Sequence, residues 1–269
     1  KIKTFTIGFE NRDYDESGYA KKIANHIGTE HNELILNQKE ALNIIPTLSN
    51  VYDEPFADSS QIPTILLSKF AKEQITVALT GDGGDELFGG YSRYIFLKNF
   101  WEKMSYLPFR FRKIFAQSID FFPIEFINKF KGIFNLFSGS EVAFFGDKVS
   151  KFSHKMQFVK SLDDLFLSSL STYQNPTKLL INSVDKSNKI FELKKNLNNP
   201  DYESLMMFID SQTYLSDDIL CKVDRASMST SLETRVPFLD KNVVNHAWNL
   251  PTSMKIKNKE GKWILKKIL

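Results

Sequence analysis

The sequence predicts an α/β fold in which a parallel β-sheet is flanked by helices and is followed by a mostly helical part. In the first 93 residues, strand-like segments take turns with segments of helical periodicity, which is the rhythm of a parallel sheet wrapped by helices. One apolar strand also runs directly into a glycine-rich turn, as happens at the phosphate-binding turns of such sheets.

Three short segments have the pattern of β-strands. Lys3–Phe9 alternates apolar and polar residues, and residues 31–36 are predicted to be a second strand. Residues 75–79, Ile-Thr-Val-Ala-Leu, are apolar and β-branched and stop at a cluster of glycines, as a short buried strand does.

Helices are expected between these strands. Residues 16–27 carry apolar side chains at helical spacing and end at Gly28, which suits a C-cap. Asn37 is expected to cap a helix that runs to about Tyr52, and Pro63 suits the first turn of a further helix. The resulting order is strand, helix, strand, helix, helix, strand.

The turn after residues 75–79 reads Thr80-Gly81-Asp82-Gly83-Gly84-Asp85-Glu86 and contains no lysine. Its glycines allow the backbone to approach a ligand closely and to adopt φ > 0. Because its three carboxylates would repel bare phosphate, the pattern favours polyphosphate with a divalent cation, or a catalytic carboxylate beside a phosphate. The alternative is a tight turn with an acidic helix N-cap.

The composition narrows the class of protein. A net charge of +3, from 35 basic and 32 acidic residues, does not predict nucleic-acid binding. A single cysteine, Cys221, excludes an internal disulfide and suits a cytoplasmic setting. No signal peptide and no apolar run long enough for a membrane span are present. The chain begins at Lys1 without Met and ends inside an apparent helix, so we expect a fragment of a longer protein.

From about residue 94 to residue 199 the periodicity is mostly helical and phenylalanine is unusually frequent. The most prominent apolar stripe at helical spacing consists of Phe126, Ile127, Phe130, Ile133, Phe134 and Phe137. Core packing is the expected explanation, and a partner or membrane surface is the alternative because basic residues flank the stripe. Residues 183–199 are polar and resemble an exposed connection.

In the last third, Asp217 and Asp218 are expected to cap a helix that carries the charged set Lys222, Asp224 and Arg225. Further on, Glu233, Arg235 and Asp240 would most often form a structural ion-pair network at a turn. Six lysines between residues 255 and 267 usually mean a solvated face, but Lys262, just after Gly261, could turn towards a phosphate.

Three blocks in the same order resemble the synthetase domain of glutamine-hydrolysing asparagine synthetases of the B type. They are residues 53–60 with Pro63, residues 80–91, and residues 224–240 with Lys262. The most specific part is Asp-Arg-Ala-Ser-Met followed by Ser-Leu-Glu-Thr-Arg-Val-Pro-Phe-Leu-Asp, shared with the β-lactam-forming relatives. The resemblance implies an adenine-nucleotide α-hydrolase-like parallel sheet flanked by helices, with a helical subdomain.

The resemblance also implies how residues 1–269, as a partial synthetase domain, are organised. Residues 1–93 would be the nucleotide-binding part, residues 94–200 a Phe-rich helical part, and residues 201–269 a helical part that completes the active site. Such synthetases carry an N-terminal glutaminase domain and a Ser-Gly-Gly-x-Asp-Ser pyrophosphate loop ahead of the Lys3–Phe9 strand. Nothing in this sequence matches either of them, so we expect the fragment alone to be inactive.

The activity implied is ATP-dependent amidation of aspartate through β-aspartyl-AMP, with Mg²⁺ as cofactor and ammonia taken from glutamine. Asp85 matches a metal-binding carboxylate, Asp82 stands where a general base would act, and Lys262 matches a lysine that neutralises the leaving pyrophosphate. The positions expected to contact ATP or its pyrophosphate are Ile7, Thr80, Gly81, Gly83 and Gly84. The weaker candidates for the substrate pocket are Glu54, Asp58, Glu233 and Arg235.

Two alternatives remain at this stage. The protein could amidate or cyclise a carboxylate other than that of aspartate, or the chain could be a non-catalytic binding or assembly module. A carboxylate at Asp82 favours ammonia chemistry over β-lactam formation, but it does not determine the acceptor. A homodimer is one possible assembly, and no nucleic-acid or membrane partner is expected.

Overall fold

The computed structural model describes residues 1–11, 15–132, 135, 144–171, 181–182, 189–195, 197 and 200–269. The chain forms two compact units, each built from two stretches of sequence. The first unit combines Lys1–Phe88 with Phe208–Pro251, and the second combines Gly89–Met207 with Thr252–Leu269. The three-part division of the sequence into residues 1–93, 94–200 and 201–269 stays a prediction.

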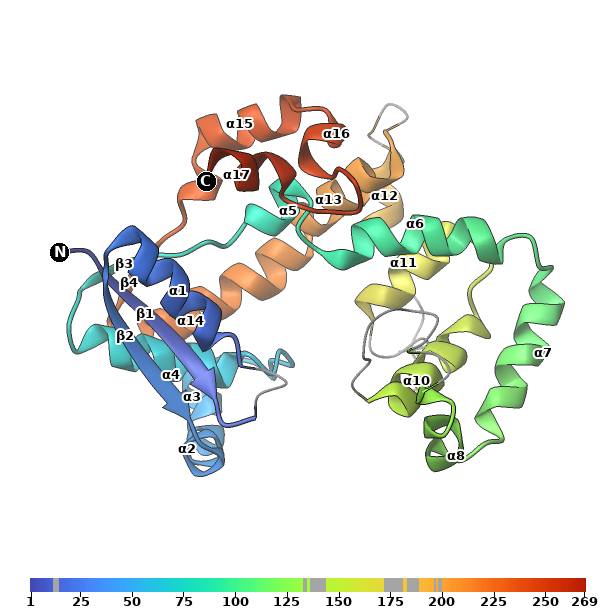
Figure 1. The fold of residues 1–269 in the computed structure, drawn as a ribbon, viewed down its shortest axis with the longest axis horizontal. Coiled ribbons are helices and arrows are strands. Elements are labelled where there is room, and N and C mark those ends of the chain that lie inside the picture. The colour runs from blue at the N-terminus through green and yellow to red at the C-terminus, as the bar shows by residue number, and fades with distance from the viewer. Residues whose placement is uncertain are drawn as a thin grey trace. The chain divides into compact units, whose positions relative to one another are not determined.

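The first unit contains two parallel strand pairs. β1 (Lys3–Phe9) pairs with β2 (Glu30–Leu36), and the two strands lie side by side in Figure 1. β3 (Val77–Leu79) pairs with β4 (Glu233–Arg235), which comes from the last third of the sequence. The helix-rich fold with small parallel sheets agrees with the α/β class. The wider nucleotide α-hydrolase-like sheet stays a prediction.

The strands β1, β2 and β3 match the sequence prediction to different degrees. β1 and β2 lie where strands were predicted. β3 is shorter than residues 75–79, and it is not the buried strand that was expected, because Val77 is 48% and Leu79 75% exposed. Among the described residues, β3 pairs with one strand, β4.

Helices make up the rest of the first unit. They are α1 (Ser17–Ile27), α2 (Gln38–Ile44), the short turn η1 (Ile45–Thr47), α3 (Leu48–Val51), α4 (Gln61–Lys72), α5 (Gly84–Phe88), the π-helical turn η3 (Leu215–Leu220), α14 (Cys221–Met228), the short turn η4 (Pro237–Leu239) and α15 (Lys241–Asn249). α13 (Tyr202–Gln212) contributes residues to both units. The core where α4 and α14 pack contains Ile44, Tyr52, Ile65 and Ala226.

Local signals in the sequence are confirmed at several helix ends. Gly28 ends α1 in the left-handed conformation with φ +75°, and its amide donates to the carbonyl of Ala24. Asn37 caps α2, since its side chain accepts from the amide of Glu40 at 2.9 Å. The helix expected to run to Tyr52 breaks at η1, because Pro46 has no amide hydrogen to donate.

The prediction that Asp217 and Asp218 cap a helix is wrong. Both residues lie inside η3, whose N-cap is Tyr214, and η3 continues directly into α14. The chain is already helical before the two aspartates, so their side chains meet no free amides of a first turn. A π-helical turn inside a longer helix is rare and often marks a functional site.

The second unit is helical in the part of the chain that the structure describes. Its helices are α6 (Ser92–Met104), α7 (Phe109–Asp120), α8 (Ile124–Asn128), α10 (Phe145–Met156), α11 (Leu162–Leu170), α12 (Lys189–Lys195), α16 (Thr252–Lys255) and α17 (Trp263–Ile268). Tyr94, Met206 and Met207 are completely buried in this unit.

The described residues of the apolar stripe are not all buried in the core. Ile127 is buried, as core packing requires, whereas Phe126 and Phe130 are 41% and 48% exposed. Ile133, Phe134 and Phe137 lie outside the described residues. The described part of residues 183–199, predicted to be an exposed connection, contains the helix α12. No described helix has both the length and the hydropathy needed to cross a membrane.

Candidate functional site

The acidic glycine turn, residues 80–86, begins at the carboxyl end of β3. The amide of Thr80 donates to the carbonyl of Arg235 at 2.9 Å, and the amide of Glu233 donates to the carbonyl of Thr76 at 3.0 Å. These bonds extend the parallel pairing of β3 with β4 by one step at each end. The second and third sequence blocks are therefore neighbours in space.

Two glycines of the turn are required by this neighbour. Gly83 has φ +80°, and a Cβ atom at this position would lie 2.6 Å from Cδ2 of Leu239. A Cβ atom at Gly84 would lie 3.1 Å from Cε2 of Phe238. η4 thus packs directly on the turn, and a side chain at either glycine would require Leu239 or Phe238 to move.

The three carboxylates of the turn differ in their surroundings. Asp82 is half-buried at the centre of the turn, and Asp85 is half-buried in the first turn of α5. Glu86 is almost completely buried, with 1% of its surface exposed. Acidic side chains are favourable at this end of a helix because the first amides carry partial positive charge.

A cavity of about 790 Å³ lies beside the turn and is lined by β1, α4, β3 and the helix α14. Thr80 and Asp82 belong to its lining, whereas Ile7, Gly81, Gly83 and Gly84 lie outside the lining that the described residues form. The Oγ1 atom of Thr80 is buried and has no hydrogen-bond partner among the described residues. A buried hydroxyl without a partner is costly, so a polar group of a ligand would be favoured there.

The three carboxylates of the turn do not by themselves form a protein metal site. Among the described residues, no three His, Cys, Asp or Glu side chains are arranged to hold a metal ion. Mg²⁺ commonly takes only one or two carboxylates and completes its shell with phosphate oxygens and water. Asp85, placed at the start of α5, is suited to be such a carboxylate.

Salt bridges connect the first sequence block, residues 53–60, to α14. Lys222 donates to Oδ2 of Asp58 at 2.6 Å and to Oγ of Ser60 at 2.7 Å, and Lys222 is buried. Burial alone would raise the pKa of the Asp58 carboxyl, but hydrogen bonds from Lys222 and Ser60 outweigh burial and lower that pKa. Asp58 therefore has internal partners. Glu54 is exposed and lines a separate cavity of about 380 Å³.

Sequence reasoning missed the partners of this block. Arg225 pairs with Asp53 at 2.6 Å, so two basic residues one helical turn apart on α14 hold two acidic residues of one loop. Asp218, on the π-helical turn, lies near Asp58, and burial together with the charge of Asp58 raises its pKa. The charged set on α14 was visible in the sequence, but its partners are more than 160 positions away.

Glu233 and Arg235 are paired with each other on the exposed face of β4. The Nε atom of Arg235 donates to Oε1 of Glu233 at 2.6 Å, and both side chains keep about half or more of their surface exposed. Two members of the predicted network thus form an exposed pair, and such pairs contribute little stability. The third member, Asp240, caps α15, since its side chain accepts from the amide of Asn242 at 2.8 Å. The structural contribution of Arg235 to the turn is its backbone carbonyl.

Lys262 belongs to the second unit, whereas Asp82 and Asp85 belong to the first. It stands immediately before α17 with φ +54°, a left-handed conformation that is uncommon for a residue with a side chain. Within the first unit, residues 53–60 and 80–88 both contact the block of residues 224–240. Residues 89–91 of the second block and Lys262 belong to the second unit.

Comparison with known proteins finds the same family that the three sequence blocks resemble. The sequence profile of the asparagine synthase family matches residues 1–269. The asparagine synthetase (glutamine-hydrolyzing) 1 of Bacillus subtilis is 32% identical over 273 residues, which cover 99% of this chain and 39% of the relative. A Methanocaldococcus jannaschii protein with a provisional name of the same kind is 32% identical over 243 residues, 88% of this chain and 42% of the relative.

A mammalian relative shows the same similarity over a shorter stretch. The asparagine synthetase (glutamine-hydrolyzing) of Bos taurus is 34% identical over 95 residues, 34% of this chain. The chain spans 39% and 42% of the length of the Bacillus and Methanocaldococcus relatives. Because the family profile matches from residue 1 to residue 269, this chain belongs to the asparagine synthase family.

Proposed function

We propose that the protein containing these residues makes asparagine from aspartate and ammonia in an ATP-dependent ligase reaction. One observation carries the proposal: the acidic glycine turn after β3 is closed by Phe238 and Leu239, from the block that most specifically resembles asparagine synthetases. The similarity of the whole chain to proteins named asparagine synthetases supports the same assignment.

The reaction would take place in two steps. In the first, an oxygen of the aspartate β-carboxylate attacks the α-phosphorus of ATP, the bond to the β-phosphate oxygen breaks, and pyrophosphate leaves. In the second, the ammonia nitrogen attacks the carbonyl carbon of β-aspartyl-AMP, and AMP leaves with the bonding electron pair. Ammonia would come from glutamine, as the names of the relatives suggest for those proteins.

The turn residues would serve the nucleotide in the first step. Backbone groups at Ile7, Thr80 and Gly81 would contact the adenosine part, and the glycines at 83 and 84 would let the pyrophosphate approach the backbone. The buried hydroxyl of Thr80 offers a hydrogen bond that the described residues leave unused. Asp85 would hold Mg²⁺, which when bound supplies positive charge to the pyrophosphate. Lys262 would add a point charge to the leaving group.

Asp82 would act in the second step. Attacking ammonia must lose a proton, and a half-buried carboxylate that lines the cavity can accept it. The proton would move from the ammonia nitrogen to a carboxylate oxygen of Asp82 as the new bond forms. Aspartate is one methylene shorter than glutamate, so this role requires the substrate carbonyl to lie close to the turn.

We further propose that residues 1–269 alone do not complete the first step. β1 and β3 line the same cavity, and the described residues pair each of them with one strand. A further parallel strand would fit between these two edges, because neighbouring strands need only about 5 Å each. The pyrophosphate loop expected from the resemblance would be supplied by such a segment.

The test uses the full-length protein with ATP, Mg²⁺, aspartate and ammonia, and it measures pyrophosphate release and asparagine formation separately. We expect release to require aspartate, and Asp82→Asn to slow asparagine formation while leaving adenylate formation largely intact. Pyrophosphate release that needs no aspartate would exclude the proposed acceptor. Equal loss of both steps in Asp82→Asn would exclude the base role.

A further inference from the structure

The segment that carries Lys262 is held in an unusual backbone conformation. Lys262 has φ +54°, and Asn258 and Lys259 have φ +53° and +62° in the turn just before it. That turn is closed by two backbone hydrogen bonds of 3.0 and 2.9 Å between Lys257 and Glu260. Left-handed residues with side chains cost free energy and persist only where surrounding contacts impose them.

The strongest of these contacts joins two glycines. A Cβ atom at Gly261 would lie 2.1 Å from the carbonyl oxygen of Gly89 and 3.3 Å from Cα of Gly90. Gly89 itself has φ +71°, and a Cβ atom there would lie 2.6 Å from Cγ1 of Ile256. The contact at Gly261 is with backbone, which has no rotamer to yield, so the two chain segments touch directly.

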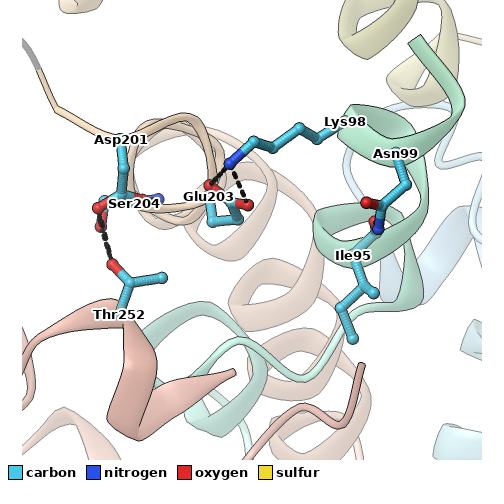
Figure 2. A network of polar contacts seen from close by, with 7 residues as sticks. All are labelled: Ile95, Lys98, Asn99, Asp201, Glu203, Ser204 and Thr252. Atoms are coloured by element: carbon cyan, nitrogen blue, oxygen red, sulfur yellow. Dashed lines mark hydrogen bonds and ion pairs between the residues drawn. The ribbon is translucent and has the colours of Figure 1, made fainter. Parts of the chain in front are cut away.

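The other end of this segment is anchored to the start of α13. The hydroxyl of Thr252 donates to Oδ2 of Asp201 at 2.8 Å and lies 2.8 Å from the hydroxyl of Ser204, as Figure 2 shows. The amide of Ile256 donates to the carbonyl of Thr252 at 2.8 Å. Thr252 is therefore tied to α13, and Ile256, one turn later, reaches Gly89.

The same part of α13 is tied to α6. Lys98 donates to Glu203 at 3.0 Å, next to the Asp201–Thr252 contact (Figure 2). Burial alone would raise the pKa of Asp201, but the hydrogen bonds that its carboxylate accepts from Ser204 and Thr252 outweigh burial and lower that pKa, so Asp201 stays an acceptor at neutral pH. Both ends of the segment from Thr252 to Gly261 are thus attached to the body of the second unit.

We propose that Gly261 is a positioning residue for the adenylation step, because its backbone contact with Gly89 sets where Lys262 stands. The proposal rests on the proposed role of Lys262 in that step. Gly89 directly follows α5 and the acidic glycine turn in the chain, so the contact joins the lysine segment to the chain leaving that turn. A residue larger than glycine can make this contact only if the segment of Gly261 and Lys262 or the segment of Gly89 shifts.

The experiment replaces Gly261 by alanine in the full-length protein. Relief from 2.1 Å to an ordinary contact of at least 3.4 Å requires a shift of more than about 1 Å. A displacement of that size can cost about 100-fold in rate, so we expect pyrophosphate formation to slow by about 100-fold. The loss should fall on kcat rather than on the KM for ATP, because the lysine is proposed to act on developing charge.

Gly18→Ala is the matched control, because nothing lies within 4 Å of a Cβ atom at that position in α1. It should keep the wild-type rate. The decisive comparison is made in a Lys262→Ala background, where adding Gly261→Ala should cause no further loss. A residue with a merely structural role would slow the enzyme by the same factor in both backgrounds.

Thr252→Val is a second variant for the case in which Gly261→Ala does not fold. It removes the hydroxyl that binds Asp201 and keeps the shape of the side chain. We expect it to slow pyrophosphate formation several-fold in the wild-type background and not at all in the Lys262→Ala background. An equal loss in both backgrounds would overturn the proposal.

The outcomes separate this inference from the proposed function. If the wild type needs aspartate and Lys262→Ala is slow, but Gly261→Ala behaves like Gly18→Ala, the positioning role is wrong and the function stands. If Lys262→Ala keeps the full rate, the proposed role of the lysine fails, and the positioning role fails with it.

Discussion

The acidic glycine turn and the Lys262 segment reach unusual backbone conformations in different ways. In the turn, the left-handed residue is Gly83, and the atoms that crowd it belong to the side chains of Leu239 and Phe238. In the segment, the left-handed residue is Lys262, and the atoms that crowd its neighbour Gly261 belong to the backbone of Gly89. In the turn, the left-handed position is occupied by a glycine, which adopts it at little cost, whereas in the segment it is occupied by a lysine.

This difference matters for how firmly each region is held. Side chains such as those of Leu239 and Phe238 can change rotamer, so the turn has some freedom to adjust around a ligand. A backbone-to-backbone contact leaves no such freedom. The carboxylates of the turn are therefore expected to be more tolerant of nearby substitutions than the lysine is.

The largest effect on stability is expected from the loss of the buried ion pair between Lys222 and Asp58 in the first unit. Lys222→Met should destabilise the protein by about 3 kcal/mol, because Asp58 would remain partly buried without its cation. Chemical denaturation of the full-length protein measures this. Arg225→Met is the control, since its pair with Asp53 is exposed and should contribute at most about 1 kcal/mol. Equal losses in the two variants would contradict the assignment.

The second largest effect is expected from replacing the glycines of the turn. It tests whether Gly83 is required because of its left-handed backbone conformation. Gly83→Ala should cost about 1–2 kcal/mol, because its φ of +80° is unfavourable for a residue with a Cβ atom. Gly84→Ala should cost less, because the ring of Phe238 can yield at a contact of 3.1 Å. Thermal unfolding of both variants gives the order. The reverse order would contradict the prediction, because Gly83 has both the left-handed φ and the closer side-chain contact, 2.6 Å against 3.1 Å.

The third effect concerns strain at Lys262. Asparagine adopts left-handed backbone more readily than lysine, so Lys262→Asn should stabilise the protein by up to about 1 kcal/mol. The same variant should lose pyrophosphate formation, because it removes the proposed charge. A gain in melting temperature with a loss of activity would show that the strain serves function. A fall in melting temperature would show that the lysine side chain itself stabilises the segment.

The smallest effect is a change in pH dependence at Asp218. Its pKa is raised in the folded protein, so its contribution to stability is present below its unfolded pKa of about 3.8 and is lost as pH rises through the folded value. Asparagine does not ionise, so the variant Asp218→Asn should not lose this stability as the pH rises. Relative to the wild type, its melting temperature should therefore improve between pH 4 and pH 7, and a pH-independent difference would contradict the raised pKa.

The parts of the fold that could be predicted from the sequence are those with a local physical cause. Gly28 ends a helix because only glycine enters the left-handed region without cost, and Asn37 begins one because its side chain accepts from the backbone. The aspartates at 217 and 218 were misassigned because the helix containing them begins earlier, through packing that no local pattern reveals. The exposed edge of β3 likewise depends on which strands surround it.

The glycines and carboxylates of one turn, the specific block of residues 224–240 and the family of the chain can all be recognised from residue types and their spacing. Which of these groups have partners follows from the folded structure. It gives Asp58 a buried lysine, pairs Glu233 with Arg235, and forces Lys262 into a left-handed conformation behind Gly261. Residue types follow from composition and spacing, but partners depend on contacts between segments far apart in the chain, which only folding brings together.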